Sequence, residues 1–558
     1  GAEEVVMRDK SAIDNLADSY LAQLAANYPS FATSIGLASG AADMDDYSPE
    51  AIERDLKLNQ STLSALQALE PKDDVDQVTK DALSQQLILD IELHAAGLQY
   101  RDLNNIASPA QGIRDVFDVS PTATVTDWEN LASRMRKVKD ALAGYQKTLA
   151  IGFEKGDGPA KRQLQEVITQ VGQINQPEGF FHEFAKGAKA DQELSTALRE
   201  ELVAAAQVAT DAYAAFGDFL QSMLPKASEQ DAIGRERYRL LSKSFLGAEI
   251  DLDETYKWGI EELARVVTEQ EAVAKEILPG ASVAEAIAHL ENDPTTKLNG
   301  TDELQKWMQR LSDKAIEDLG KTHFDIAEPL RKLECMIAPT KHGGIYYTGP
   351  SDDFSRPGRM WWSVPEGVES FDTWRETTTV YHEGVPGHHL QVAQATYIRE
   401  TLNDWRRLAS WTSGHGEGWA LYAERLMDEL GYLVTPADRL GMLDGQRMRA
   451  ARVVLDLGVH LGKPKLDGTG VWDFDYALEF MSKNVNMSPE FVRFEVTRYF
   501  GWPGQAPSYK IGQRIWEQIR DDYQARKGSE FDMKKFHSTA LNLGGLGLDA
   551  LKEAMSRA

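Results

Sequence analysis

Residues 382–389 read His-Glu-Gly-Val-Pro-Gly-His-His and place three of the eleven histidines of the chain beside a glutamate. Zinc prefers neutral imidazole and carboxylate ligands, and a catalytic zinc site uses three protein ligands and leaves one position for water. The common helical motif His-Glu-x-x-His brings two imidazoles to one helix face over a spacing of four residues. Here the residue four after His382 is Pro386, which cannot be a ligand. The stretch therefore predicts a zinc site with an altered spacing.

Two residues are candidates for the second imidazole ligand. In a straight helix His389, seven residues after His382, returns to the same face, but at a distance of about 10 Å, which is too long for one ion. His388 would point away in an ideal helix. The two glycines and the proline between the histidines make such a helix unfavourable, because proline removes a ladder hydrogen bond and glycine permits a bulge. We expect a break that carries His388 to the ion, and His389 remains the alternative.

Carboxylates complete the predicted site. Glu383 directly follows the first histidine, the position of a general base that takes a proton from water and passes it to a leaving amine. A third ligand should come from another helix. The best candidate is Glu417, which we expect at the start of such a helix. Glu424 lies seven residues later on the same face, where it can orient an imidazole or serve only as a surface glutamate. His415 could bind metal or substrate, or shape the loop.

Composition sets the class of the protein. The 558 residues are 42% hydrophobic and 26% charged, which is typical of a globular protein, and no window predicts a transmembrane helix. A formal net charge of -27 argues against nucleic acid as the main partner. Cys335 is the only cysteine, which excludes an intrachain disulfide and a four-cysteine zinc site. The chain does not begin with methionine, so a missing signal peptide carries no information about the compartment.

The periodicity of apolar residues predicts a mainly α protein with two lobes. Apolar residues recur at steps of three and four over residues 13–28, 202–220 and 260–267, so residues 1–330 read as a mostly helical N-terminal lobe. Residues 331–558 form the second lobe, which carries the zinc motif. Aromatic runs at 343–350 and 360–364, separated by a turn, predict a small β-hairpin directly before the histidine cluster. We expect the following helix to begin near Ser370 or Asp372.

Further motifs give the chain a family resemblance. Besides residues 382–389, these motifs are Glu-Gly-Trp-Ala at 417–420, the run from Arg452 to His460, Pro-Gly-Gln at 503–505 and Ser-Tyr-Lys-Ile-Gly at 508–512. Together they resemble the bacterial family of unknown function DUF885, over most of the chain. That family is similar in layout to the helical gluzincin zinc metallopeptidases. The resemblance implies a large two-lobed helical fold with the small β element beside the active-site helix, and members are often exported.

The resemblance also implies roles for particular residues. In gluzincins Gly-His-x-Leu closes the zinc motif, which residues 387–390 match and which supports His388 as ligand. A tyrosine downstream of the third ligand should stabilise the oxyanion, and Tyr509 fits this role better than Tyr499. The strand with Tyr346 and Tyr347 would then be an edge strand on which an extended substrate lies. Its alternative is a plain structural hairpin.

Three arginines lie close to the predicted site in sequence, at positions 447, 449 and 452. One of them could hold a substrate carboxylate through two hydrogen bonds, near Asp456 and His460. A buried pair between Arg452 and Asp456, four residues apart on one helix, is the alternative.

The sequence thus predicts a zinc-dependent hydrolase that cleaves amide bonds of short peptides or peptide-like molecules. The metal would be held by His382, His388 and Glu417, with Glu383 as base and Tyr509 as electrophilic helper. Two alternatives stay open, namely a metallohydrolase of a non-peptide amide or ester and a non-catalytic binding protein on the same scaffold. The oligomeric state and the choice between exo- and endo-cleavage are not encoded in any motif.

Overall fold

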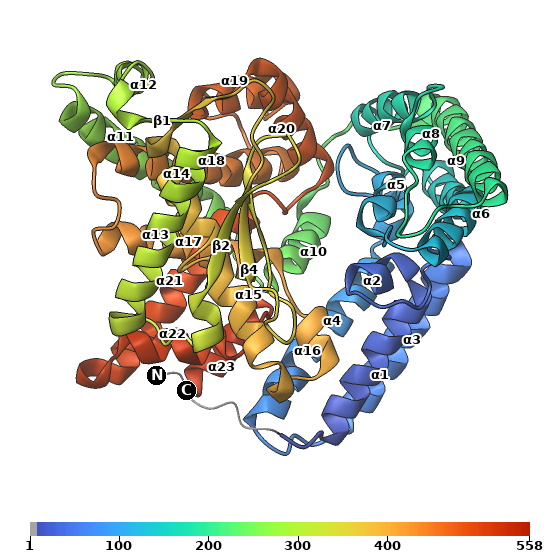
Figure 1. Cartoon of the computed structure of the whole chain (residues 1–558), viewed down its shortest axis with the longest axis horizontal. Helices are drawn as coiled ribbons and strands as arrows, with labels where there is room; N and C mark the ends of the chain where they lie inside the picture. The colour runs from blue at the N-terminus through green and yellow to red at the C-terminus, as the bar shows by residue number, and fades with distance from the viewer. Residues whose placement is uncertain (1–7) are drawn as a thin grey trace.

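The computed structural model describes residues 8–558 as a mainly α-helical protein, which confirms the predicted fold class. The first four helices are α1 (Ala12–Asn27), α2 (Pro29–Ser34), α3 (Pro49–Gln67) and α4 (Asp74–Ala95). A helical bundle follows, with α5 (Pro109–Val119), α6 (Val125–Glu154), α7 (Lys161–Ile174), α8 (Phe180–Lys186) and α9 (Thr196–Met223). Figure 1 shows this bundle at one side of the molecule, with α1 and α3 below it.

The remaining helices build a larger body that surrounds a small sheet (Figure 1). They are α10 (Arg235–Leu246), α11 (Leu252–Ile277), α12 (Val283–Glu291), α13 (Thr301–Thr322), α14 (Thr373–Glu383), α15 (His388–Tyr397), α16 (Asp404–Leu408), α17 (Ser413–Glu429), α18 (Pro436–His460), α19 (Phe474–Asn484), α20 (Pro489–Gly501), α21 (Ser508–Lys527), α22 (Met533–Leu541) and α23 (Leu548–Ser556). The strands are β1 (Lys297–Asn299), β2 (Leu333–Ile337), β3 (Ile345–Thr348), β4 (Gly358–Trp362) and β5 (Ser370–Asp372).

The predicted hairpin is present as β3 and β4, but it belongs to a three-stranded sheet in the order β2-β4-β3. β3 pairs with β4 in antiparallel orientation and β2 pairs with β4 in parallel orientation, so β3 has one open edge in this sheet. A second, two-stranded sheet joins β1 to β5. The sequence analysis did not predict β1, β2 or β5. α14 begins directly after Asp372, one of the two predicted start positions.

Buried apolar side chains form three clusters in the described part of the chain. The first lies within the bundle α5–α9 and draws on residues 103–220 alone. The second spans the larger body and includes residues of α1 and α4 together with residues of α22 and α23. The third joins α18, α19 and α20. Packing therefore groups the chain differently from the predicted halves 1–330 and 331–558, because the second cluster draws on both sides of residue 330.

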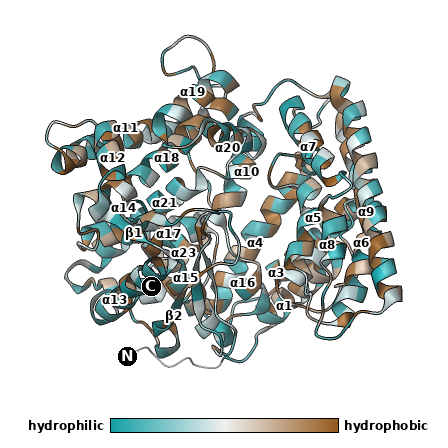
Figure 2. Ribbon diagram, turned by 45° about the horizontal axis from the view of Figure 1, so that its top comes forward, coloured by the Kyte–Doolittle hydropathy of each residue, from teal (hydrophilic) through white to brown (hydrophobic). Residues whose placement is uncertain are grey.

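Within residues 8–558, none of the helices combines the length and the apolar composition needed to cross a membrane. Figure 2 shows hydrophobic and hydrophilic residues mixed along the helices, the pattern of helices that bury one face and expose another.

Candidate metal centre

The helix that carries the first histidine is broken, as predicted. α14 ends at Glu383 and α15 begins at His388, with four residues between them. A Cβ atom at Gly387 would lie 1.9 Å from the carbonyl oxygen of His382, so no residue but glycine fits there without movement of the backbone. The indole N–H of Trp419 donates to the carbonyls of Pro386 (3.0 Å) and Gly387 (3.2 Å). The break is thus a defined turn, held from α17.

This turn brings the two imidazoles together. The ring centroids of His382 and His388 are 4.9 Å apart and the ring planes are nearly perpendicular. Glu417 of α17 lies between the rings, with one oxygen 2.8 Å from Nε2 of His388 and the other 3.6 Å from Nε2 of His382. An oxygen of Glu383 is 3.8 Å from Nε2 of His382. Four predicted residues therefore converge on one point.

The donor set fits a zinc ion. Ligand atoms of His382, Glu383 and His388 all lie within 4.8 Å of one another. Zinc–ligand bonds of about 2.0–2.2 Å in tetrahedral arrangement place neighbouring ligand atoms about 3.4 Å apart. The 3.6 Å between His382 and Glu417 matches this spacing, and the shorter contact of His388 with Glu417 is a hydrogen bond. Two imidazoles and one carboxylate form a ligand set that zinc hydrolases use.

Glu424 orients the first imidazole. Its carboxylate is buried and accepts a hydrogen bond of 2.8 Å from Nδ1 of His382, which leaves Nε2 directed at Glu417. Such a carboxylate behind a metal-binding histidine fixes the tautomer and the ring orientation. The hydroxyl of Thr378 donates to the other oxygen of Glu424. The sequence analysis missed Thr378, although its position four residues before His382 places both on one face of α14.

Electrostatics of the cluster favour a cation. Burial opposes the charged form of His382, but hydrogen bonds to Glu417 and Glu424 and their charges raise its pKa to about 10. Burial raises the pKa of Glu383, and the neighbouring charge of Glu417 adds to this effect. Burial also acts on Glu417, yet hydrogen bonds from both histidines hold its pKa well below the usual range. The carboxylates thus create a negative potential that a bound cation would neutralise.

Tyr509 lies in the first turn of α21, half-buried, and α21 packs along α17. The two helix backbones meet at glycines, because a Cβ at Gly418 would lie 2.5 Å from the backbone of Gly512, and a Cβ at Gly512 would lie 2.2 Å from the carbonyl oxygen of Gly414. This close approach explains the glycines of the motifs at 417–420 and 508–512. The role of the Tyr509 hydroxyl as an oxyanion donor stays a prediction.

His389 points away from the cluster. Its Nδ1 accepts from the hydroxyl of Tyr347 (2.7 Å) and its Nε2 donates to the carbonyl of Leu330 (2.8 Å). Both ring nitrogens are therefore engaged, which argues against His389 as the second ligand. The contact with Tyr347 holds β3 against α15. A Cβ at Gly358 of β4 would lie 2.4 Å from the Tyr347 hydroxyl, so glycine makes room for this contact.

Tyr346, the neighbour of Tyr347, projects to the other side of β3. It is exposed and stacks on Trp361 of β4, with ring centroids 6.3 Å apart. β3 is the edge strand that the sequence predicts, next to the helix that begins with His388. Its use by a substrate stays a prediction.

His415 occupies an aromatic pocket at the start of α17. Its ring lies 5.7 Å from that of Trp411 and 5.3 Å from that of Trp516, and burial lowers its pKa to about 3. Nδ1 accepts from the amide of Gln391 at 3.1 Å, while Nε2 has no hydrogen-bond partner among the described residues. These contacts favour the loop-shaping role among the three roles considered for His415.

Arg452 and His460 are bound within the protein. Arg452 donates to Glu495 and to the hydroxyl of Tyr499, both at 2.9 Å, and its guanidinium lies 5.2 Å from the centre of the Tyr509 ring. His460 accepts from the backbone of Ile233 and donates to the carbonyl of Tyr499. These contacts favour a structural role for both residues over direct substrate binding.

The alternative pair of Arg452 with Asp456 is wrong. Asp456 accepts from the Tyr238 hydroxyl and from the backbone N–H of Gly504, both at 2.8 Å. Among the three arginines, Arg447 is occupied by Asn484 and Gln270. Arg449 lies nearer to the histidine cluster, with its guanidinium 3.6 Å from Glu424 and its Nε without a partner in the described chain.

Comparison with known families covers almost the whole chain. The profile of the family described as "Bacterial protein of unknown function (DUF885)" matches residues 29–555. The chain belongs to this family. No curated protein matches this DUF885 chain.

Two solved structures share the fold of this DUF885 chain. One is a candidate lipoprotein from Colwellia psychrerythraea, with a TM-score of 0.84 and 22% sequence identity over 99% of each chain. The other is a candidate lipoprotein of unknown function from Shewanella oneidensis, with a TM-score of 0.75 and 16% identity over 98% of this chain and all of the other. A carboxypeptidase from Pyrococcus furiosus aligns with a TM-score of 0.40 and 11% identity over 99% of each chain, a likeness too loose to bear on activity.

Proposed function

We propose that this DUF885 protein is a zinc-dependent hydrolase that cleaves amide bonds of short peptides or peptide-like molecules. The observation that carries the proposal is the convergence of His382, His388 and Glu417 from three helices, with Glu383 beside them and Glu424 behind His382. A structural histidine pair needs no second carboxylate at its centre, whereas hydrolysis needs a base within reach of the water that attacks.

The residues divide the chemistry among themselves. His382, His388 and Glu417 would hold zinc, which supplies Lewis acidity toward water and the substrate carbonyl. Glu383 accepts a proton from the attacking water while the oxygen of this water bonds to the carbonyl carbon of the substrate. The same carboxyl then gives this proton to the amide nitrogen as the C–N bond breaks, so the products are a carboxylate and an amine. Tyr509 would donate a hydrogen bond to the developing oxyanion.

The surroundings of the cluster support a peptide as substrate. The open edge of β3 offers backbone N–H and C=O groups to an extended peptide, which would add a strand beside Tyr346. The hydrogen bond from Tyr347 to His389 fixes this strand relative to α15, the helix that His388 begins. An extended chain on this edge would therefore lie beside the histidine cluster.

The test compares two variants with the unmodified protein. Zinc content is measured after purification with added zinc, and a mixed library of di- to decapeptides is analysed by mass spectrometry. We expect about one zinc per chain and defined cleavage products. Glu383→Gln should retain the metal and lose at least about 100-fold in kcat, a loss in the range expected for a removed general base. His388→Ala should lose the metal.

Other outcomes would assign one of the alternatives. Bound zinc with no peptide cleavage, beside turnover of another amide or an ester, would assign a non-peptide metallohydrolase. No metal uptake at all would refute the proposed site and leave a binding protein on the same scaffold.

The compartment is part of the proposal. The two structures with the same fold are both described as candidate lipoproteins. We propose that this chain is also exported, either as a lipoprotein or in free form. Fractionation of cells that carry the full-length gene would test this, since recovery in the cytoplasm alone would contradict it.

A further inference from the structure

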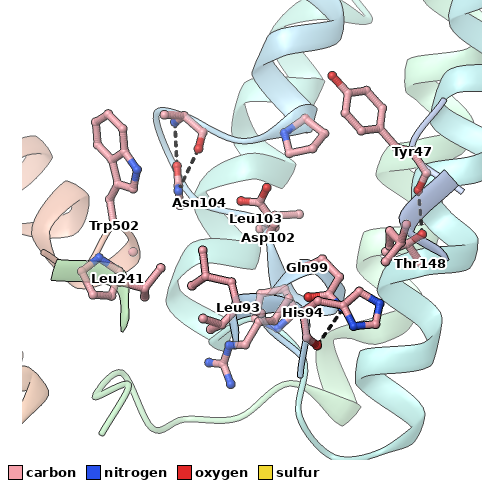
Figure 3. Close-up of a pocket in the computed structure, with 18 of the residues that line it drawn as sticks. Tyr47, Leu93, His94, Gln99, Asp102, Leu103, Asn104, Thr148, Leu241 and Trp502 are labelled. Atoms are coloured by element: carbon pink, nitrogen blue, oxygen red, sulfur yellow. Dashed lines mark hydrogen bonds between the residues drawn. The ribbon is translucent and has the colours of Figure 1, made fainter. Parts of the chain in front are cut away.

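A second site lies apart from the histidine cluster. A cavity of about 540 Å³ opens between α3 and α4 on one side, α6 on another, and α10 with the loop after α20 on a third. This volume is in the range of pockets that hold small organic molecules. Figure 3 shows Asp102 among the lining residues, with Trp502 and Leu241 on one side and Tyr47 and Thr148 on the other. None of the lining residues belongs to the proposed zinc site.

The walls of the cavity are largely apolar and aromatic. The aromatic lining residues come from segments far apart in the sequence, and they are Tyr28, Tyr47, Tyr145, Phe245, Phe500 and Trp502. Tyr47 and Tyr145 are neighbours, with ring centroids 6.1 Å apart. Aromatic faces carry negative charge density and attract cations. The cavity therefore suits a ligand with an apolar body and a positive charge.

The charged groups of the lining are mostly acidic. Five aspartates line the cavity. Two of them form ion pairs with arginines of the chain, Asp55 with Arg54 and Asp231 with Arg162. Arg101, the one arginine of the lining, forms an ion pair with Asp157 at 2.7 Å. His94, which also lines the cavity, contacts Glu53 at 3.1 Å. Both basic residues of the lining thus already face an acidic partner.

The three remaining aspartates, Asp46, Asp90 and Asp102, have no ion pair in the described chain, and Asp46 accepts from the backbone N–H of Ser48. Asp90 accepts a hydrogen bond from the amide of Gln86. The backbone carbonyl of Asp102 accepts from the Tyr145 hydroxyl, but its carboxylate has no hydrogen-bond donor among the described residues. The side chain of Asp102 is exposed and lines the cavity. Burial raises the pKa of the carboxyl groups of Asp90 and Asp102 to about 6. At neutral pH each is therefore an anion, with Asp90 half-buried and Asp102 exposed toward the cavity, and an added cation would stabilise both.

The cavity suits an organic cation better than a metal ion. Within residues 8–558, one group of three potential metal ligands has its atoms within 4.8 Å of one another, and it consists of His382, Glu383 and His388. Within the described residues, no three carboxylates of the cavity come this close to one another. A primary ammonium needs only one carboxylate as acceptor and can pack its carbon skeleton against aromatic walls.

We propose that this cavity binds an organic molecule with a primary ammonium group and an apolar body, with Asp102 as the main acceptor and Asp90 as a second negative charge. The ammonium could belong to a free amine or to the amino terminus of a hydrophobic peptide. In the second case the cavity would also serve the proposed peptidase, but its binding does not depend on the zinc site.

Calorimetric titration of the full chain at pH 7.5 tests the proposal. One arm uses phenethylamine and its N-acetyl derivative, which keeps the ring and loses the charge. The other arm uses leucyl-phenylalanine amide and its N-acetyl derivative on the Glu383→Gln background, where the peptide is not consumed. We expect saturable binding of at least one of the two amines, weaker by at least tenfold for its acetylated form.

Variants assign the binding to the cavity. Asp102→Asn keeps the shape of the side chain and should weaken binding at least tenfold. Asp140→Asn is the matched control, since Asp140 is an exposed residue of α6, the helix that also carries Tyr145. Leu241→Trp fills part of the cavity and should also weaken binding. This variant tests the proposal independently in case Asp102→Asn does not fold.

Each result has one meaning. Binding of phenethylamine alone identifies a free amine, and binding of the dipeptide amide alone identifies a peptide amino terminus. The proposal is overturned if neither amine binds, if the acetylated forms bind equally well, or if Asp102→Asn and Leu241→Trp leave the affinity unchanged. Cleavage by the zinc site is measured separately, so failure here leaves the proposed hydrolase intact.

Discussion

Replacement of Glu424 by glutamine probes the orientation of His382, the first of the proposed zinc ligands. The carboxylate of Glu424 is 1% exposed and accepts hydrogen bonds from Nδ1 of His382 and from Thr378. Glutamine has nearly the same shape but offers one neutral oxygen as acceptor, so its NH₂ group must face one of the two donors. His382 would then lose a charged acceptor or Thr378 would lose its partner.

The magnitude follows from the hydrogen bond that changes. A hydrogen bond to a charged group contributes about 1.5–3 kcal/mol. Loss of such a partner behind a metal-binding histidine typically lowers metal affinity by about 10- to 100-fold. At about 1.4 kcal/mol for each factor of ten, the two estimates agree. We therefore expect the zinc dissociation constant of Glu424→Gln to rise by this factor.

A competition titration with a chromogenic chelator measures the dissociation constant directly. Glu429→Gln is the matched control, because Glu429 is an exposed residue at the end of the same helix and contacts Arg520 at 3.5 Å. Circular dichroism of both variants verifies that α17 remains folded. An unchanged zinc affinity in folded Glu424→Gln would refute the role assigned to Glu424, and an equal loss in Glu429→Gln would show a general effect of charge.

Three further changes test the packing around the site. Gly387→Ala places a Cβ against the carbonyl oxygen of His382, so we expect the free energy of unfolding to fall by about 3 kcal/mol and zinc binding to weaken. Urea denaturation measures the free energy of unfolding. A value within about 0.5 kcal/mol of that of the unmodified protein would contradict the tight turn. Trp419→Phe removes the donor to Pro386 and Gly387 and should cost about 1–3 kcal/mol by the same measurement, whereas an unchanged stability would show that water replaces the indole. Burial raises the pKa of Asp456 from 3.8 to about 7, although the hydrogen bonds from Gly504 and Tyr238 act in the opposite direction. Between these two pH values Asp456 is therefore protonated in the folded protein and ionised in the unfolded chain. Its contribution to stability is therefore present below pH 4 and falls by about 1.4 kcal/mol per unit up to pH 7, and Asp456→Asn should be less sensitive to pH over this window in urea titrations at pH 5 and pH 8. Equal pH dependence of both proteins would show that Asp456 is charged in the folded state.

The sequence allowed the centre of the site to be predicted because its constraints are local. Gly384, Pro386 and Gly387 disfavour a continuous helix, and a break at this place changes which histidine joins His382 at Glu417. Glu383 is adjacent in sequence, and Glu417 and Glu424 share one face of a helix through their spacing. Each of these inferences needs only the geometry of one helix.

Contacts between distant segments could not be predicted in this way. His389 was an open alternative because its partners, Tyr347 and Leu330, lie 42 and 59 residues away in sequence. Arg452 has an acidic residue four positions away, yet it pairs with Glu495, which α20 brings against it. In the same way β2 is a strand because it pairs with β4 across a connection that no local pattern reveals.

The arrangement of the hydrophobic clusters has a consequence for the order in which the chain folds during synthesis. The buried members of the bundle cluster all come from one continuous segment, residues 103–220, so they leave the ribosome before the residues of the candidate metal centre. The cluster of the larger body packs α1 and α4 with helices that end near residue 555. Since domains fold as units while the amino-terminal part emerges first, the bundle can form early, whereas α1 and α4 complete their packing only after α22 and α23 have been synthesised. The larger body, which holds the candidate metal centre, therefore completes its core only after the residues up to Met555 have been synthesised.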